Sequence, residues 1–281
     1  MTIKLELEFE RAGFRVYNRA VVVPEKDAPR YIWSGALPIL HRLDEHILTA
    51  NVFGTLEKLD YNIWLRAFLE RIFGPENAKE LVSTQNLQDP GVKFAFWKEL
   101  PPPGPGDRPR GREEEPTRVD VLIETPEGNV SIQCRLRGEL AKLIETDKPD
   151  LDKGRYGTPE ASWWDEAIRN IERGYRYSFP KRFYLVFLSV EDEKPIFSQY
   201  RSPEKIKRKI ESPYRWTYNQ KKFFNDQTYE ALSKRIAWVE WKTLLDVLDA
   251  IQFPDKAQNG FRVELVEYLE SKTALLQKYF R

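Results

Sequence analysis

The sequence predicts an α/β protein with a central mixed sheet flanked by helices and with an N-terminal β-rich addition. Three observations predict this class. Helical and strand-like apolar patterns both recur along the chain. Residues 118–123 and 129–136 are runs rich in β-branched side chains on either side of a turn cluster, which indicates a hairpin. Residues 183–190 form a continuous apolar run, which is typical of a strand buried on both faces.

Composition limits what the chain can do. Of its 281 residues, 41% are hydrophobic and 13% aromatic, enough for a substantial core. Charged residues reach 32% but nearly cancel to +1, so any attraction to nucleic acid must come from local patches. One cysteine excludes an intramolecular disulfide, and with only two histidines it cannot form a usual zinc site. A bound metal would therefore be a hard cation held by carboxylates.

The N-terminal region predicts strands rather than a targeting signal. Residues 1–10 alternate apolar and charged side chains, which is a strand pattern, and residues 15–23 are rich in β-branched and aromatic side chains. No apolar run approaches the roughly 20 residues that span a bilayer. We therefore expect a soluble, cytoplasmic protein with no membrane partner.

The next elements follow from spacing and from breaker residues. Residues 37–81 show helical spacing, and Gly74 followed by Pro75 ends one helix. Residues 92–97 are a candidate strand before the hairpin. Residues 101–116 contain six prolines, three glycines and seven charged residues, so we expect a flexible loop there. Later helices are expected over residues 161–177, 203–210, 241–251 and 263–279.

These elements divide the chain into three parts. We expect a β-rich and helical addition over residues 1–55 and a core over residues 56–200, with the flexible loop at 101–116. A helical extension over residues 201–281 would pack on that core. The loop is not taken as a domain boundary, because the segments on both sides of it look like parts of one sheet.

Side-chain alternation in the hairpin gives its two strands an apolar and a polar face. A hairpin without a bulge that buries both apolar sets places Asp120 on the same face as Gln133 and Arg135. The alternative interpretation is a half-exposed sheet whose polar face only meets water. The apolar sets are Val119, Val121 and Ile123 on the first strand, and Val130, Ile132, Cys134 and Leu136 on the second.

The segment VDVLIETPEGNVSIQCRLRG, residues 119–138, resembles the PD-(D/E)XK nuclease motif, in which an Asp lies on one strand and an acid-x-Lys triplet on its partner. The following helix, the strand at 183–190 and residues 241–245 are also similar to restriction endonuclease-like members, and the resemblance covers roughly residues 61–190. It implies a restriction endonuclease-like core, cleavage of DNA phosphodiester bonds and a Mg²⁺ or Mn²⁺ cofactor. The setting it suggests is bacterial restriction or antiviral defence.

The resemblance also implies roles for individual positions. Asp120 matches the first metal ligand, and the carbonyl of Cys134 matches a backbone ligand of the metal. Gln133 lies where the second acid belongs, and it offers a neutral oxygen in place of a negative charge. Arg135 lies where the Lys belongs; it keeps the positive charge, but a pKa above ~12 makes it a poor proton acceptor.

Three explanations of this altered signature stay open. The missing carboxylate comes from elsewhere in the chain, or the natural protein is a non-cutting relative that keeps the fold for binding, or Gln133 is an introduced Glu→Gln change. The function is accordingly a metal-dependent nuclease, an inactive nuclease-like subunit for nucleic-acid binding or assembly, or a protein-binding scaffold. Candidates for the missing carboxylate are Glu57, Glu70, Glu124 and Glu166.

Basic residues outside the motif suggest phosphate contacts. Interleaved cations and aromatics suit phosphate binding and base stacking, although a solvated helix beside ordinary core aromatics gives the same pattern. We expect DNA as a partner, together with a second copy of the chain or a partner protein of a defence system. His41 and His46 fall in no catalytic motif. The candidate nucleic-acid-binding residues are Arg137, Lys142, Lys205, Lys207, Arg208 and Lys209, the last four just before an aromatic-rich stretch at 214–224.

Overall fold

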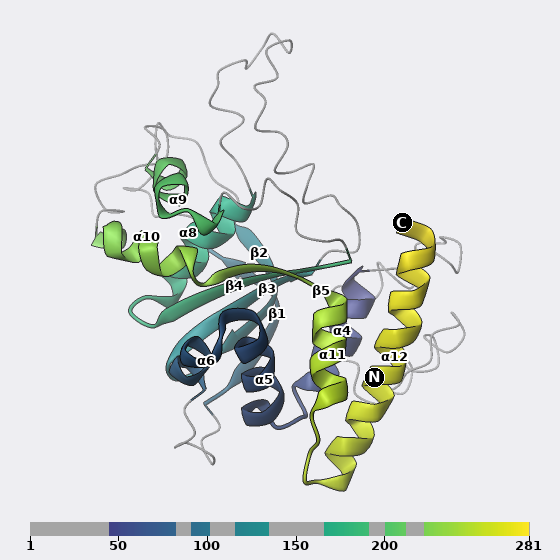
Figure 1. Cartoon of the computed structure of the whole chain (residues 1–281). Helices are drawn as coiled ribbons and strands as arrows, with labels where there is room; N and C mark the ends of the chain where they lie inside the picture. Colours follow the sequence, from purple (N-terminus) through teal and green to yellow (C-terminus); the bar gives the residue numbers. More distant parts are fainter. Residues whose placement is uncertain are drawn as a thin grey trace. The chain divides into compact units, whose positions relative to one another are not determined.

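The computed structural model describes residues 45–82, 91–101, 116–134, 166–190, 200–211 and 222–280 (Figure 1). The chain divides into two compact units, with boundaries at residues 88/89 and 239/240. The first unit is helical, and the second contains the sheet. The expected N-terminal strands, His41 and most of the proline-rich loop lie outside the described residues.

The helical unit is made of segments from both ends of the described chain. Its second helix is capped at the start by Asp60, whose carboxylate accepts a hydrogen bond from the Asn62 N–H, and at the end by Gly74, where φ is +83°. Glycine adopts that left-handed backbone without steric cost. The expected stop at Gly74 and Pro75 is confirmed. The helices of this unit are α4 (Glu45–Leu56), α5 (Tyr61–Phe73), α6 (Pro75–Leu81), α11 (Trp241–Ala250) and α12 (Lys256–Phe280).

Among the residues that the structure describes, the sheet unit contains five strands in the order β1-β2-β3-β4-β5. Neighbouring strands are antiparallel from β1 to β3, whereas β3 and β4 are parallel, so the sheet is mixed. The predicted α/β class with a mixed sheet is therefore confirmed (Figure 1). The strands are β1 (Lys93–Leu100), β2 (Thr117–Glu124), β3 (Gly128–Cys134), β4 (Arg182–Ser189) and β5 (Ile236–Glu240).

Three further helices belong to this unit: α8 (Glu166–Ser178), α9 (Pro203–Ile210) and α10 (Asp226–Ser233). Ala167, Ile168 and Ile171 of α8 pack into one apolar core with alternate residues of β4. The helix approaches the sheet closely at Gly174, where an added Cβ would lie 2.3 Å from the Phe183 ring. The absence of a side chain at this position therefore sets the distance between α8 and β4.

The predicted hairpin is confirmed. Thr125 closes its turn, because its Oγ1 both donates to the Gly128 carbonyl and accepts from the Gly128 N–H. The register pairs Val121 with Ile132 and Ile123 with Val130, as burial of the two apolar sets requires. The other face is also buried, since Ser131 has no exposed surface. A polar face that only meets water is therefore wrong for this hairpin.

Several boundaries differ from those expected. Helix α12 begins at Lys256, seven residues before the expected start, and the Asp255 carboxylate accepts from the Gln258 N–H at that end. Gly260 within this first part weakens its helical pattern in the sequence. The strand β5 and the helix α10 were not expected, because each is short and carries little periodic signal. None of the described helices is both long and apolar enough to cross a membrane.

Candidate active site

Asp120 lies near the middle of β2 and is only 8% exposed. Its Oδ2 accepts a hydrogen bond of 2.8 Å from the backbone N–H of Cys134 on β3. The last backbone pair of the two strands at this end is Val121 with Ile132, so Asp120 is one position beyond it. The carboxylate thus takes the place of a backbone acceptor where the β2–β3 ladder stops.

Gln133 makes the reciprocal contact from β3. It has no exposed surface, and its Nε2 donates to the backbone carbonyl of Arg118 on β2 at 3.2 Å. It also lies one position beyond the last backbone pair. Asp120 and Gln133 therefore face each other across the end of the ladder, each bound to the opposite strand's backbone. These contacts give each of the two buried polar side chains a hydrogen-bond partner, as burial requires.

The regular alternation of β2 breaks at this position. Thr117 accepts a hydrogen bond from Arg173 of α8, and Glu124 accepts one from Tyr177 of the same helix. Residues seven apart on a regular strand point to opposite faces, so one reversal must lie between them. Val119 also packs with Leu122 in one apolar cluster. The sequence-based assignment of Val119 to the face of Val121 is therefore wrong.

The neighbouring strand shows where the reversal occurs. Trp97 of β1 has a φ of +50°, which is uncommon for a residue other than glycine. The β1–β2 pairing includes Phe96 with Val121 and Lys98 with Val119 but skips Trp97 and Asp120. Both strands are thus distorted at Asp120, in a conformation that the surrounding packing must hold. An expectation based on a strand without irregularity could not place this carboxylate.

Glu124 does not supply the missing carboxylate. It lies four residues from Asp120, or about 13 Å along a regular strand. The Tyr177 hydroxyl donates to its Oε1 at 2.8 Å, and Lys98 lies over the Tyr177 ring. Burial and the Glu124 carboxylate raise the pKa of Tyr177 to about 12. Glu124 is therefore part of a separate contact between the sheet and α8.

The other three candidate carboxylates do not lie on the strands of the sheet. Glu57 and Glu70 belong to the helical unit, where Glu70 pairs with Arg66 at 2.8 Å and burial raises the pKa of Glu57. Glu166 is the first residue of α8. Among the residues that the structure describes, no three His, Cys, Asp or Glu side chains gather into a group suited to a metal ion.

The predicted basic residues fall into two groups. Arg135, Arg137 and Lys142 lie outside the described residues. On α9, the side chains of Lys205 and Arg208 are exposed, whereas Ile206 and Ile210 are buried in the core.

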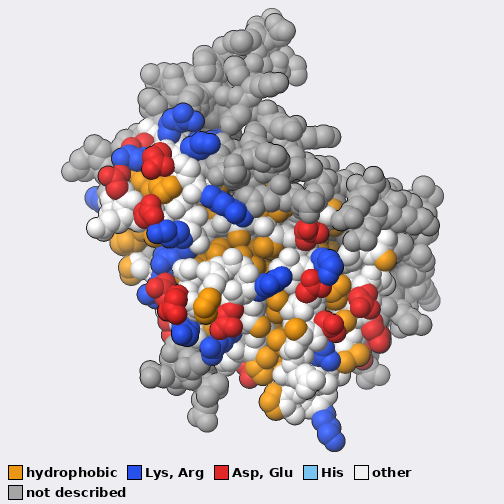
Figure 2. Space-filling view, in the orientation of Figure 1, with side chains coloured by type: hydrophobic (Ala, Val, Ile, Leu, Met, Phe, Trp, Pro, Cys, Tyr) orange, Lys and Arg blue, Asp and Glu red, His pale blue; other side chains and the backbone are white. Residues whose placement is uncertain are grey.

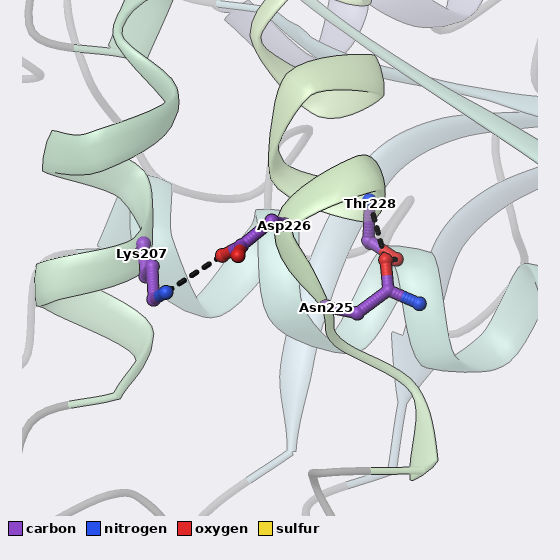
Figure 3. Close-up of polar contacts among 4 residues, drawn as sticks. All are labelled: Lys207, Asn225, Asp226 and Thr228. Carbon is purple, nitrogen blue, oxygen red and sulfur yellow. Dashed lines mark hydrogen bonds and ion pairs between the residues drawn. The ribbon is translucent and has the colours of Figure 1, made fainter.

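The remaining two cations of α9 have partners. The Lys207 Nζ is 2.6 Å from the Asp226 carboxylate of α10, and Figure 3 draws this contact. This hydrogen bond is the largest of the effects that raise the pKa of Lys207. Lys209 lies over the ring of Tyr200. In Figure 2 acidic and basic side chains are interspersed over the region of α9 and α10, so this surface is not uniformly basic.

Sequence reasoning missed the polar contacts of α8. Arg173 is almost fully buried, and its guanidinium donates a hydrogen bond of 2.6 Å to the Thr117 hydroxyl. Arg173 precedes Tyr177 by four residues on α8. The i, i+4 spacing of these two side chains places them on one side of the helix. That spacing was visible in the sequence, but it did not show that this side faces the sheet.

Comparison of the chain with protein-family models, with curated proteins and with solved structures finds no match. The part of the chain that the structure describes thus defines the class as an α/β protein, with five strands in a mixed sheet.

Proposed function

We propose that this chain is a metal-dependent nuclease of the PD-(D/E)XK kind, which cleaves DNA phosphodiester bonds with an altered signature. One observation carries the proposal: the Asp120 carboxylate is 2.8 Å from the backbone N–H of Cys134, beside Gln133 and where the β2–β3 ladder stops. The resemblance assigns the metal to this carboxylate and to the Cys134 carbonyl. A role in bacterial restriction or antiviral defence is part of the same proposal.

The order of elements supports the proposal. The strand with Asp120 pairs antiparallel with the strand that carries Gln133 and Cys134. The chain then forms α8 and returns as β4, which pairs parallel with β3. The PD-(D/E)XK resemblance expects this succession of two paired strands, a helix and a buried strand. Order alone does not define a function, so the site residues must carry the argument.

The oxygen-bearing groups at this position suit a hard cation. Asp120 offers a carboxylate, Cys134 a carbonyl and Gln133 an amide oxygen, and Mg²⁺ binds oxygen ligands such as one or two carboxylates together with substrate phosphate. Because the Gln133 Nε2 donates to Arg118, its Oε1 is the end of the amide suited to a cation. Such an ion activates water and stabilises charge on the phosphate. This set carries one negative charge where the family motif has two, so we expect weaker metal binding.

A second candidate is a nuclease-like subunit that binds nucleic acid without cutting it. The burial of both polar side chains favours it, since Asp120 is 8% exposed and Gln133 is fully buried. Their bonds to the opposite backbones give both residues a structural role that needs no metal. In that case the signature positions would join β2 to β3, and binding would depend on the surface cations.

A plasmid assay with Mg²⁺ or Mn²⁺ tests the proposal on the chain as it stands and on three variants. A nuclease should lose cleavage in Asp120→Asn, and Gln133→Glu should increase cleavage by restoring the second charge. Glu124→Gln is the matched control, because it removes a carboxylate from the same strand about 13 Å away. A gel shift without cleavage in any variant would support the non-cutting subunit. If no variant cleaves the plasmid and none shifts it, the remaining candidate is the protein-binding scaffold.

A further inference from the structure

An exposed aromatic side chain follows the last turn of α8. Phe179 is 48% exposed, the more exposed of the two large hydrophobic side chains that stand out on the described surface. The Tyr175 ring meets it at 6.3 Å between centroids and 65°, and the Phe223 ring at 5.4 Å and 85°. Edge-to-face contacts of this kind fix the orientation of a ring. Phe179 is therefore exposed but held in place.

The rings beneath Phe179 are part of the core. Tyr175 and Phe223 are partly buried and pack against the apolar cluster that α8 shares with β4. Tyr175 also contacts Phe224 at 5.2 Å, and Phe224 stacks on Tyr229 at 5.8 Å and 13°. A continuous series of rings thus runs from the buried core to the Phe179 surface, which makes this surface rigid.

Basic residues lie next to Phe179 and Phe223 in the sequence. Residues 176–182 contain Arg176, Lys181 and Arg182 and no acidic residue. The Arg176 guanidinium lies 5.1 Å from the centre of the Phe223 ring. Lys222, which precedes Phe223, is exposed. We call Tyr175, Arg176, Phe179, Lys181, Lys222 and Phe223 the Phe179 platform.

We propose that the Phe179 platform binds single-stranded nucleic acid, with an unpaired base stacked on Phe179 and the phosphates near Arg176, Lys181 and Lys222. Every unpaired base offers a flat face to an aromatic ring, whereas the bases of a duplex are stacked on one another. Aromatic surfaces also receive proline-rich peptides. Clustered cations without a nearby acid in the same segment favour a polyanion over such a peptide.

The position of the platform connects it with the candidate active site. Ser178, the residue before Phe179, accepts a hydrogen bond from Asn129 at the start of β3. Gln133 lies four residues further along β3, or about 13 Å. The inference rests on the proposed function only in naming nucleic acid as the substrate; it adds that the bound strand is unpaired. Binding at the platform itself requires no metal and no cleavage.

Fluorescence anisotropy of the full chain with a labelled oligothymidine, and with a duplex of the same length, tests this inference. We expect tighter binding to the oligothymidine. Phe179→Ala should weaken it about tenfold, as loss of one stacked base does, and Phe179→Tyr should keep it. Lys222→Ala should reduce the dependence of binding on salt. Val263→Ala is the control, because it shortens the other exposed hydrophobic side chain, on α12.

Unchanged binding in Phe179→Ala would overturn the inference, and weakened binding supports it when melting curves show the variant to be folded. Preference for the duplex, or binding of a proline-rich peptide but not of oligothymidine, would overturn it as well. These results are separable from those of the plasmid assay. Plasmid cleavage without oligothymidine binding would refute the platform and leave the nuclease proposal intact. Oligothymidine binding that depends on Phe179, without cleavage, would support the platform and refute the nuclease.

Discussion

The two ends of the β2–β3 hairpin are held together in different ways. At the turn end, Thr125 and Gly128 satisfy each other, and α8 packs closely on the adjacent start of β4 through Gly174. At the open end, the backbone ladder stops and the side chains of Asp120 and Gln133 supply the cross-strand hydrogen bonds. Close packing therefore stabilises one end, and buried polar side chains stabilise the other. The residues suited to chemistry lie at the end where the regular ladder is absent.

The largest expected loss of stability comes from a substitution at the turn end. Gly174→Ala places a Cβ 2.3 Å from the Phe183 ring. Because this distance is too short, the ring and α8 must move apart. Overpacking of a core costs typically 1–3 kcal/mol, so we expect the free energy of unfolding to fall by about 3 kcal/mol. Urea denaturation measures it.

Gly260→Ala is the control for this change. Its added Cβ meets no atom within 4 Å, and alanine is the better helix former, so we expect a gain of up to about 1 kcal/mol in the free energy of unfolding. Equal losses in the two variants would mean that the contact between Gly174 and Phe183 does not limit the approach of α8.

The next largest loss of stability is expected from a substitution at the open end. Asp120→Ala leaves the buried N–H of Cys134 without its carboxylate acceptor, which should cost about 2 kcal/mol of the free energy of unfolding. Asp120→Asn retains an acceptor oxygen and should cost less. If both variants unfold at the wild-type urea concentration, Asp120 has no structural role at this position. Unchanged unfolding is the result expected if the Asp120 carboxylate were exposed in an open site and bound to no backbone group.

The turn end could be predicted from the sequence, whereas the open end could not. Thr125 and the four residues after it are a turn cluster, and the apolar residues on either side fix the register. The same alternation failed at Asp120, because it assumes a regular strand. The positive φ of Trp97 depends on tertiary packing and has no signal in a sequence that carries no glycine there. Local chemistry thus predicts the fold better than it predicts the candidate site.

The surface of α9 shows a similar limit. The sequence showed that Lys205, Lys207, Arg208 and Lys209 are close together, but not that Lys207 pairs with a residue nineteen positions later. The partner lies at the start of α10, a helix that was not expected. Pairing between distant segments is decided by packing, so a basic cluster in the sequence does not establish a basic surface.

Two substitutions that act at the start of α10 compare the contribution of a helix cap to stability with that of an ion pair. The expected losses are smaller than those above. The Asn225 Oδ1 accepts a hydrogen bond of 2.8 Å from the Thr228 N–H and caps the helix, close to the ion pair of Lys207 with Asp226 (Figure 3). Asn225→Ala should lower the free energy of unfolding by about 1 kcal/mol. Lys207→Ala should hardly change the melting temperature, because exposed ion pairs contribute little. A larger loss in Lys207→Ala would show that the ion pair attaches α9 to α10.

The smallest effect at neutral pH concerns Tyr177, which joins α8 to Glu124 at the turn end of β2. Its pKa is raised from 10 to about 12 by burial and by its hydrogen bond to Glu124. A group whose pKa is higher in the folded state stabilises that state below the unfolded value and loses this contribution as pH rises through the folded value. Stability should therefore be independent of Tyr177 ionisation at neutral pH and fall between about pH 10 and 12.

Tyr177→Phe should make the loss of stability in this alkaline range less steep, and the tyrosinate absorbance of the folded wild type should show one group that ionises late. Glu124→Gln removes the carboxylate that disfavours the tyrosinate, so the pKa of Tyr177 should move back toward 10 in that variant. If the titration of Tyr177 is the same with and without the Glu124 charge, burial alone raises its pKa, and Glu124 would not be held by this contact. The exclusion of Glu124 as the second acid would then rest on its distance from Asp120 alone.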